Sequence, residues 1–284
     1  MLSKKSRNGP SSVGLWQGCP KVKIISMRKW CLLLILPAAL AGGFAWWFRA
    51  PLLAWYRSAG GTVEMGVRKS PQPDPQTYAV LVSELKRWRD ELAARHQRAR
   101  SDSERAAVER DARVILELAL PEMMRCWLGT PYDFNGTATK PGDGRIACGY
   151  YVATVLMDAG FRVDRYQLAK QPSENILRSF LEKDACRLTV GKPYDAFAAD
   201  LSQSEPGIYL IGLDTHVAFA IPEGGGAFRF IHASGSRPWS VVDEDRNEAL
   251  VLQRSNWRML GNLTADPKVI RRWLKAEKIL VRGA

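Results

Sequence analysis

Cys148 stands where a protein can activate a thiol. It follows a Gly-rich loop, TATKPGDGRIA, and begins the run CGYYVATVLMDAG, whose apolar spacing predicts a helix that ends at Gly160. A helix N-terminus carries partial positive charge and free N–H groups, which stabilise a thiolate and can hold an oxyanion. We therefore expect the pKa of Cys148 to fall from about 8.5 toward neutrality. A packed, unreactive cysteine is the alternative for this position taken alone.

Two of the three histidines in the chain flank a predicted β-hairpin. The run HVAFAI begins one strand at His216, the glycines of EGGG form the turn, and FRFIH returns to His232. Antiparallel pairing then places both histidines at the end of the sheet away from the turn, on one face. A neutral His216 imidazole can accept the thiol proton, and His232 can orient that base. Two structural histidines with satisfied hydrogen bonds are the alternative.

The surrounding patterns predict an α+β domain with helices packed on an antiparallel sheet. Helices are expected at 148–159 and 172–183. Strands are expected at 207–213, 216–221 and 228–232, with weaker strand candidates at 249–254 and 279–282.

A helical arm is expected at 77–120, before this domain. Apolar residues recur there at helical spacing, beginning with Leu81 and Leu85, and the charged stretch 93–111 suits a solvated helix or helical hairpin broken near 101–103. The apolar pattern ends at Pro121, and we interpret His96 in the charged stretch as a surface residue, not a catalyst.

The start of the chain carries a candidate membrane segment. Residues 30–48 contain no charge, and tryptophans mark both ends, so 30–49 is predicted to be a transmembrane or signal-anchor helix. The basic residues lie mainly upstream, which places the rest of the chain outside the cytoplasm. An uncleaved inner-membrane anchor is favoured, although cleavage near Ala41 would release the protein. Residues 1–26 are either a cytoplasmic tail or an extension that is not translated.

These features divide the chain into five parts. We expect a basic tail at 1–29, the membrane helix at 30–49, a Gly- and Pro-rich linker at 50–76, the helical arm at 77–120 and the α+β domain at 121–284.

The net charge of +12 does not by itself indicate nucleic-acid binding. Seven basic residues and no acidic residue occur before residue 31, so the remainder carries a net charge of only +5. No nucleic-acid-binding motif is recognisable, so we do not expect nucleic acid to be a partner of this chain.

The five cysteines are scattered, with no C-x-x-C pair, so we expect neither a metal site nor a cofactor. Cys126 and Cys186 are more readily explained as buried free thiols than as a disulfide.

The run LGTPY at 128–132, the Gly-rich loop, the cysteine at a helix start, HVAFAI and FIHAS together resemble the NlpC-type cell-wall peptidases. These papain-like cysteine hydrolases cut peptide bonds in the stem peptides of peptidoglycan. The resemblance covers about residues 120–240 and implies Cys148 as nucleophile, His216 as base and His232 as the orienting residue. It also matches Tyr132 to a tyrosine near the nucleophile, which either donates a hydrogen bond toward the reacting carbonyl or only packs.

The chain departs from the family pattern beside the nucleophile. The family's Asp and Ser, which help recognise the free amino end of the stem peptide, are Ala147 and Gly149 here, and the family's W-G-G is replaced within 133–136. Asp143 and Arg145 are candidates for replacement contacts, although solvated loop charges are the simpler interpretation.

The leading expectation is therefore a periplasmic or extracellular hydrolase of peptidoglycan stem peptides that uses a Cys-His-His triad. An amidase or acyltransferase acting on another envelope substrate with the same residues is an alternative. A non-catalytic envelope scaffold with a degenerate hydrolase fold is a second one.

Overall fold

The computed structural model describes residues 71–284. The expected basic tail, the expected membrane helix at 30–49 and most of the expected linker lie outside the described residues. Within 71–284, no helix combines the length and the apolar character needed to cross a bilayer.

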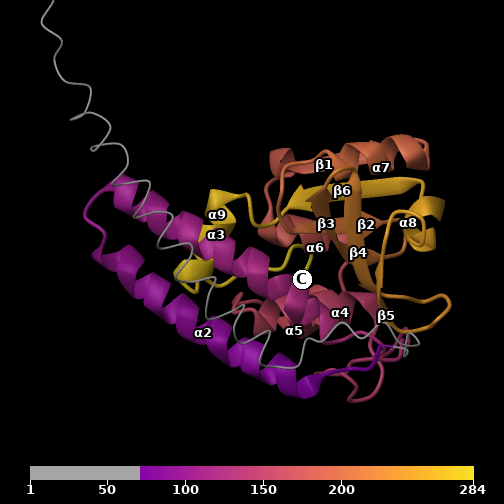
Figure 1. The fold of residues 1–284 in the computed structure, drawn as a ribbon, viewed down its shortest axis with the longest axis horizontal. Helices are drawn as coiled ribbons and strands as arrows, with labels where there is room; N and C mark the ends of the chain where they lie inside the picture. The colour runs from indigo at the N-terminus through magenta and orange to yellow at the C-terminus, as the bar shows by residue number, and fades with distance from the viewer. Residues whose placement is uncertain (1–70) are drawn as a thin grey trace, which may run out of the picture. The chain divides into compact units, whose positions relative to one another are not determined.

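A six-stranded antiparallel sheet forms the centre of the described unit, with the strand order β1-β6-β2-β3-β4-β5 (Figure 1). The strands are β1 (Cys186–Val190), β2 (Tyr209–Leu213), β3 (Val217–Gly224), β4 (Ala227–Ala233), β5 (Val241–Glu244) and β6 (Trp257–Asn262). The expected α+β class with an antiparallel sheet is therefore confirmed.

Helices cover both faces of this sheet (Figure 1). Strand alternation sends Ile211 toward α7, whereas Phe219 packs edge-on against Tyr151 of α4 on the opposite face. One layer contains α4 (Cys148–Asp158), α5 (Arg165–Ala169) and α6 (Ser173–Phe180); the other contains α7 (Tyr194–Ser202) and α8 (Leu250–Arg254), and the short 3₁₀ helix η1 (Lys183–Ala185) precedes β1. The two predicted helices at 148–159 and 172–183 are thus present, the second ending earlier than expected.

The predicted arm is a helical hairpin made of α2 (Pro75–Arg98) and α3 (Asp102–Arg125), and α9 (Pro267–Leu274) packs against both. The break falls where the sequence predicts it, because the Ser101 hydroxyl accepts the Glu104 N–H and caps α3. The sequence predicts that the helix ends at Pro121, but α3 continues through Pro121 and across the predicted domain boundary at 120–121. Buried side chains on either side of the proline, such as Leu120 and Met124, offset the missing hydrogen bond.

Both of the weaker strand predictions are wrong. Residues 249–254 form the short helix α8, and 279–282 contribute only one isolated bridge, between Val163 and Ile279. Strands β1, β5 and β6 were not expected, because each is short and none shows a clear alternation of apolar and polar residues.

The interpretation of His96 as a surface residue is also wrong, since its side chain is buried. Its Nε2 lies 3.2 Å from Glu109 Oε1, and the neighbouring Arg95 reaches Asp111 at 2.9 Å. The charged runs of α2 and α3 therefore pair with each other across the hairpin instead of facing only solvent.

Gly149 allows α4 and α5 to approach closely at the start of α4. A Cβ atom at this position would lie 2.3 Å from the carbonyl oxygen of Ala169, which is backbone and cannot rotate away. A serine at this position would therefore not fit this packing.

We expect Gly149→Ala to lower the free energy of unfolding by about 1–3 kcal/mol, because the added methyl group forces the two helices apart. Gly261→Ala is the matched control, since its Cβ would meet the flexible end of the Leu181 side chain. Urea unfolding of both variants should show the larger loss for Gly149→Ala. Equal losses would contradict the steric account.

Candidate active site

The candidate nucleophile begins α4, and no side chain caps that helix. Ala147 stands at the N-cap position and offers no oxygen, so the N–H groups of the first turn are not consumed by a cap. The N–H groups of Cys148 and Gly149 both favour the thiolate of Cys148. An uncapped helix start thus leaves donors near the Cys148 sulfur, and donors in such a position are able to hold an oxyanion.

The loop that leads to Cys148 is held in place by a buried arginine. Arg165 donates to the Thr154 hydroxyl of α4 at 2.6 Å and to the Ala138 carbonyl of the loop at 2.7 Å. Its guanidinium also stacks on Tyr150 at 4.9 Å. One side chain therefore fixes the Gly-rich loop relative to the helix that carries the nucleophile.

A tight turn between β2 and β3 positions His216. The Leu213 N–H donates to the His216 carbonyl at 2.8 Å and closes the turn. The Asp214 carboxylate accepts hydrogen bonds from the Ser255 hydroxyl and from the Asn256 N–H, and these bonds lower the pKa of Asp214. The turn is thereby attached to the segment that begins β6, which limits the freedom of the histidine backbone.

Cys148 and His216 border the same pocket, which has a volume of 850 Å³. The N–H of Val217, the residue after His216, favours the Cys148 thiolate, so the start of β3 lies next to the sulfur. The start of β3 and the tip of α4 thus meet at this pocket, although they are far apart in the sequence. Other side chains that line the pocket include Phe134, Asn135, Thr137, Tyr150, Lys170, Ser173, Glu174 and Trp257.

A chain of hydrogen bonds extends from His216 away from the pocket. Nε2 of His216 lies 2.8 Å from Nδ1 of His232, and Nε2 of His232 lies 3.1 Å from Oε2 of Glu244. The two rings are nearly perpendicular, with centroids 4.8 Å apart. The prediction that both histidines share one face at the same end of the sheet is confirmed.

Burial keeps both imidazoles neutral. It lowers the pKa of His216 well below 6.5, and the neighbouring His232 lowers it further. It lowers the pKa of His232 to about 3, since this ring is fully buried. A neutral His216 at ordinary pH is able to accept a proton.

The expectation of a depressed thiol pKa is wrong. Burial raises the pKa of Cys148, and this effect outweighs the three N–H groups of Val217, Gly149 and Cys148 itself, which act in the opposite direction. A raised thiol pKa together with a lowered imidazole pKa favours the neutral pair over an ion pair.

Burial raises the pKa of the Tyr132 hydroxyl. Tyr132 also lies close enough to Cys148 for the charge of a thiolate there to raise the pKa of Tyr132 further. Its backbone N–H donates to the Trp239 carbonyl at 2.7 Å, which attaches it to the segment after β4. Within residues 71–284, its hydroxyl makes no hydrogen bond, and Tyr132 is not among the residues that line the Cys148 pocket.

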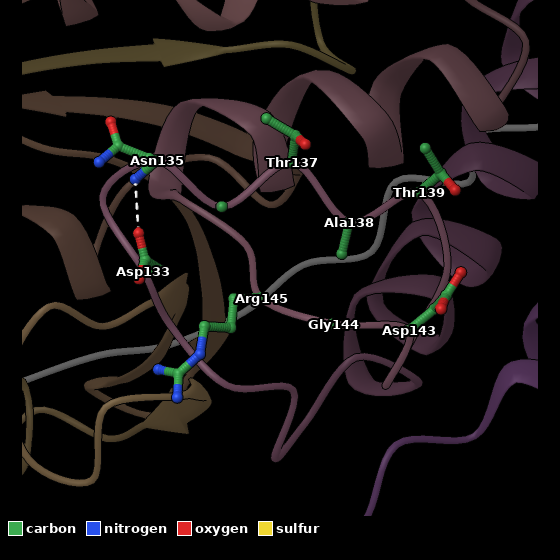
Figure 2. A pocket seen from close by; sticks show the side chains of 9 residues that line it. Asp133, Asn135, Thr137, Ala138, Thr139, Asp143, Gly144 and Arg145 are labelled. Carbon is green, nitrogen blue, oxygen red and sulfur yellow. Dashed lines mark hydrogen bonds between the residues drawn. The ribbon is translucent and has the colours of Figure 1, made fainter.

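Asp143 and Arg145 do not reach the Cys148 pocket. Both are exposed and line a neighbouring polar pocket of 510 Å³, together with Asp133 (Figure 2). Figure 2 shows their side chains pointing away from each other. The two pockets share Asn135 and Thr137, but the loop charges themselves lie outside the candidate site.

Cys126 and Cys186 are free thiols. Burial raises the pKa of Cys126 to about 12 and that of Cys186 to about 11, so neither resembles an activated cysteine. Across 71–284, no group of three or more His, Cys, Asp or Glu side chains is arranged to hold a metal ion.

The sequence patterns predict His216 and His232 but do not point to Glu244. It ends β5, whose register with β4 pairs it with Phe230, diagonally next to His232. An acidic residue in a strand next to FRFIH would be the signal, but strand β5 has no recognisable sequence pattern.

The buried histidines make stability dependent on pH. The unfolded chain takes up a proton on His232 as the pH falls through about 6.5, whereas the folded chain does so only near 3. His232 therefore contributes stability above 6.5 that is lost as the pH falls, by up to about 1.4 kcal/mol per pH unit.

We expect His232→Gln to lose less stability than the wild type between about pH 6.5 and pH 4.5, as measured by urea unfolding across that range. Cys148→Ala keeps both rings and is the control, which should follow the wild type. Parallel curves for His232→Gln and the wild type would show that the ring is not kept neutral by the fold.

No family model matches the chain, and neither a curated protein nor a solved structure matches it.

Proposed function

We propose that this chain is a papain-like cysteine hydrolase of the NlpC type that cleaves an amide or peptide bond in peptidoglycan stem peptides. The observation that carries the proposal is that Cys148 at the tip of α4 and His216 border one pocket, while His232 supports His216 from behind through a 2.8 Å contact between Nε2 of His216 and Nδ1 of His232. Because the His232 bond occupies Nε2, the nitrogen of His216 that remains for the thiol is Nδ1.

The chemistry follows the thiol-hydrolase sequence. Nδ1 of His216 takes the proton from Cys148 as Sγ bonds to the substrate carbonyl carbon. The N–H groups at the start of α4 stabilise the oxyanion, and the Tyr132 hydroxyl is a second candidate donor, since Tyr132 lies close enough to feel the charge of Cys148. The imidazolium then protonates the leaving amine as the C–N bond breaks, which leaves a thioester on Cys148.

Water completes the cycle with the same groups. It loses a proton to Nδ1 of His216 as its oxygen attacks the thioester carbonyl. The C–S bond breaks, the carboxylic acid departs, and the proton returns from the imidazolium to the sulfur. Cys148 and His216, which carry the acyl and proton transfers, both border the pocket.

The pocket suits an extended, mixed polar substrate. Its wall combines the exposed ring of Phe134, which is 80% exposed, with the ammonium group of Lys170 and the carboxylate of Glu174. A stem peptide offers carboxylates, amides and short apolar side chains, which these groups can contact. Substrate access from the envelope is consistent with the proposed membrane anchor at 30–49.

An amidase or acyltransferase acting on another envelope substrate is the second candidate. It is favoured by the altered surroundings of Cys148, where Ala147 and Gly149 offer no side-chain oxygen to a substrate amino group. Cys148 and His216 would serve either reaction, so the identity of the products distinguishes a peptidase from an amidase or acyltransferase.

The test is digestion of purified peptidoglycan by the full chain, with the products identified by mass. We expect soluble stem-peptide fragments from the wild type and a loss of at least about 1,000-fold in rate for Cys148→Ala, which removes the nucleophile.

Cys186→Ala is the matched control, because this half-buried thiol lies outside the pocket and its loss should leave the rate unchanged. Release of fragments by Cys148→Ala at the wild-type rate would contradict the proposal. A folded wild-type protein that releases no fragments would also contradict it.

A further inference from the structure

Glu244 has no place in a three-residue site, yet it continues the hydrogen-bond chain beyond His232. The Glu244 side chain is 16% exposed, its Oε2 lies 3.1 Å from Nε2 of His232, and the His232 ring is fully buried. A carboxylate held against a buried imidazole controls where that ring carries its proton.

The proton positions along the chain follow from the charge on Glu244. An ionised carboxylate only accepts hydrogen bonds, so His232 must carry its proton on Nε2 and present a lone pair at Nδ1. His216 must then donate from Nε2 to that lone pair. Its remaining nitrogen, Nδ1, is left unprotonated, which is the form that can take a proton from Cys148.

A protonated Glu244 reverses every donor. The carboxylic acid donates to Nε2 of His232, whose proton moves to Nδ1 and is donated to Nε2 of His216. His216 then carries its proton on Nδ1 and is no longer a base toward the sulfur. The two arrangements have the same heavy-atom positions and differ only in protonation.

We propose that Glu244 is a positioning residue whose carboxylate fixes the tautomers of His232 and His216, so that the base toward Cys148 exists only while Glu244 is ionised. This inference rests on the proposed function for the role of Cys148, but the tautomers themselves can be observed without any substrate. It gives the site a proton-dependent setting that a Cys-His-His triad alone lacks.

The surroundings of Glu244 place its ionisation near neutral pH. The pKa of Glu244 is raised to about 7. Burial is the largest cause and repulsion from Glu248 the next, while the positive charge of Arg229 lowers the pKa. The groups that face it are His232 and Arg229 of β4, Asp243 of its own strand, and Asp245 and Glu248 of the following turn. Because the active tautomer needs the carboxylate, it is expected above pH 7 and lost as the pH falls below that value.

The chain suits a direct test, since it contains only three histidines. With ¹⁵N-histidine in the full chain, the nitrogen shifts distinguish protonated from unprotonated ring positions. We expect His216 of the wild type to be protonated on Nε2 about one unit above pH 7 and on Nδ1 about one unit below it. Glu244→Gln keeps the shape but cannot ionise, so its His216 tautomer should be the same at both pH values.

Glu248→Gln is the matched variant, because it removes a neighbouring charge without touching the hydrogen-bond chain. Loss of that repulsion lowers the pKa of Glu244, so the tautomer change should move to lower pH while the high-pH form stays intact. The signals of His96, which pairs with Glu109 elsewhere, report on folding in all three proteins.

The outcomes separate the two proposals. A wild-type His216 protonated on Nδ1 above pH 7, or a Glu244→Gln variant that still changes tautomer with pH, would overturn the role of Glu244. The expected tautomers in a protein that leaves peptidoglycan intact would overturn only the proposed substrate. Cleavage by the wild type with an acid limb that Glu244→Gln does not remove would overturn only the positioning role.

Discussion

The contact between the tip of α4 and the start of β3 is the constraint on which the site depends. It brings the Cys148 sulfur next to the Val217 N–H, one residue after His216. Tyr151 of α4 packs edge-on against Phe219 of β3. The close approach at Gly149 and the Arg165 bonds fix α4 relative to α5 and the preceding loop, and the Asp214 bonds fix the β2–β3 turn. Burial at this contact also sets the charges, since it raises the pKa of the thiol and lowers that of the imidazole.

The parts of this arrangement that were predictable from sequence are those with local signals. The helix beginning at Cys148 has helical apolar spacing, and the hairpin that carries His216 and His232 has alternating strands around a glycine turn. Register then follows from the turn, and register alone places the two rings together. The α+β class with an antiparallel sheet followed from the same local patterns.

The parts that were missed depend on contacts between distant segments. The pKa of Cys148 could not be predicted, because a helix terminus favours a thiolate while burial, which only packing reveals, opposes it more strongly. Glu244 and strand β5 carry no local pattern and acquire their role from pairing with β4. His96 was misplaced for the same reason, since the partner that removes it from solvent, Glu109, lies on the other helix of the hairpin.

The central claim is that His216 acts on the Cys148 thiol, and the rate of thiol alkylation at neutral pH measures this most directly. Peptide mapping by mass assigns the rate to Cys148, while Cys126 and Cys186, with thiol pKa values of about 12 and 11, should react slowly. The account predicts that His216→Ala slows alkylation of Cys148 by roughly tenfold or more, because the raised thiol pKa leaves little thiolate without a base. Equal rates in the wild type and in His216→Ala would contradict it.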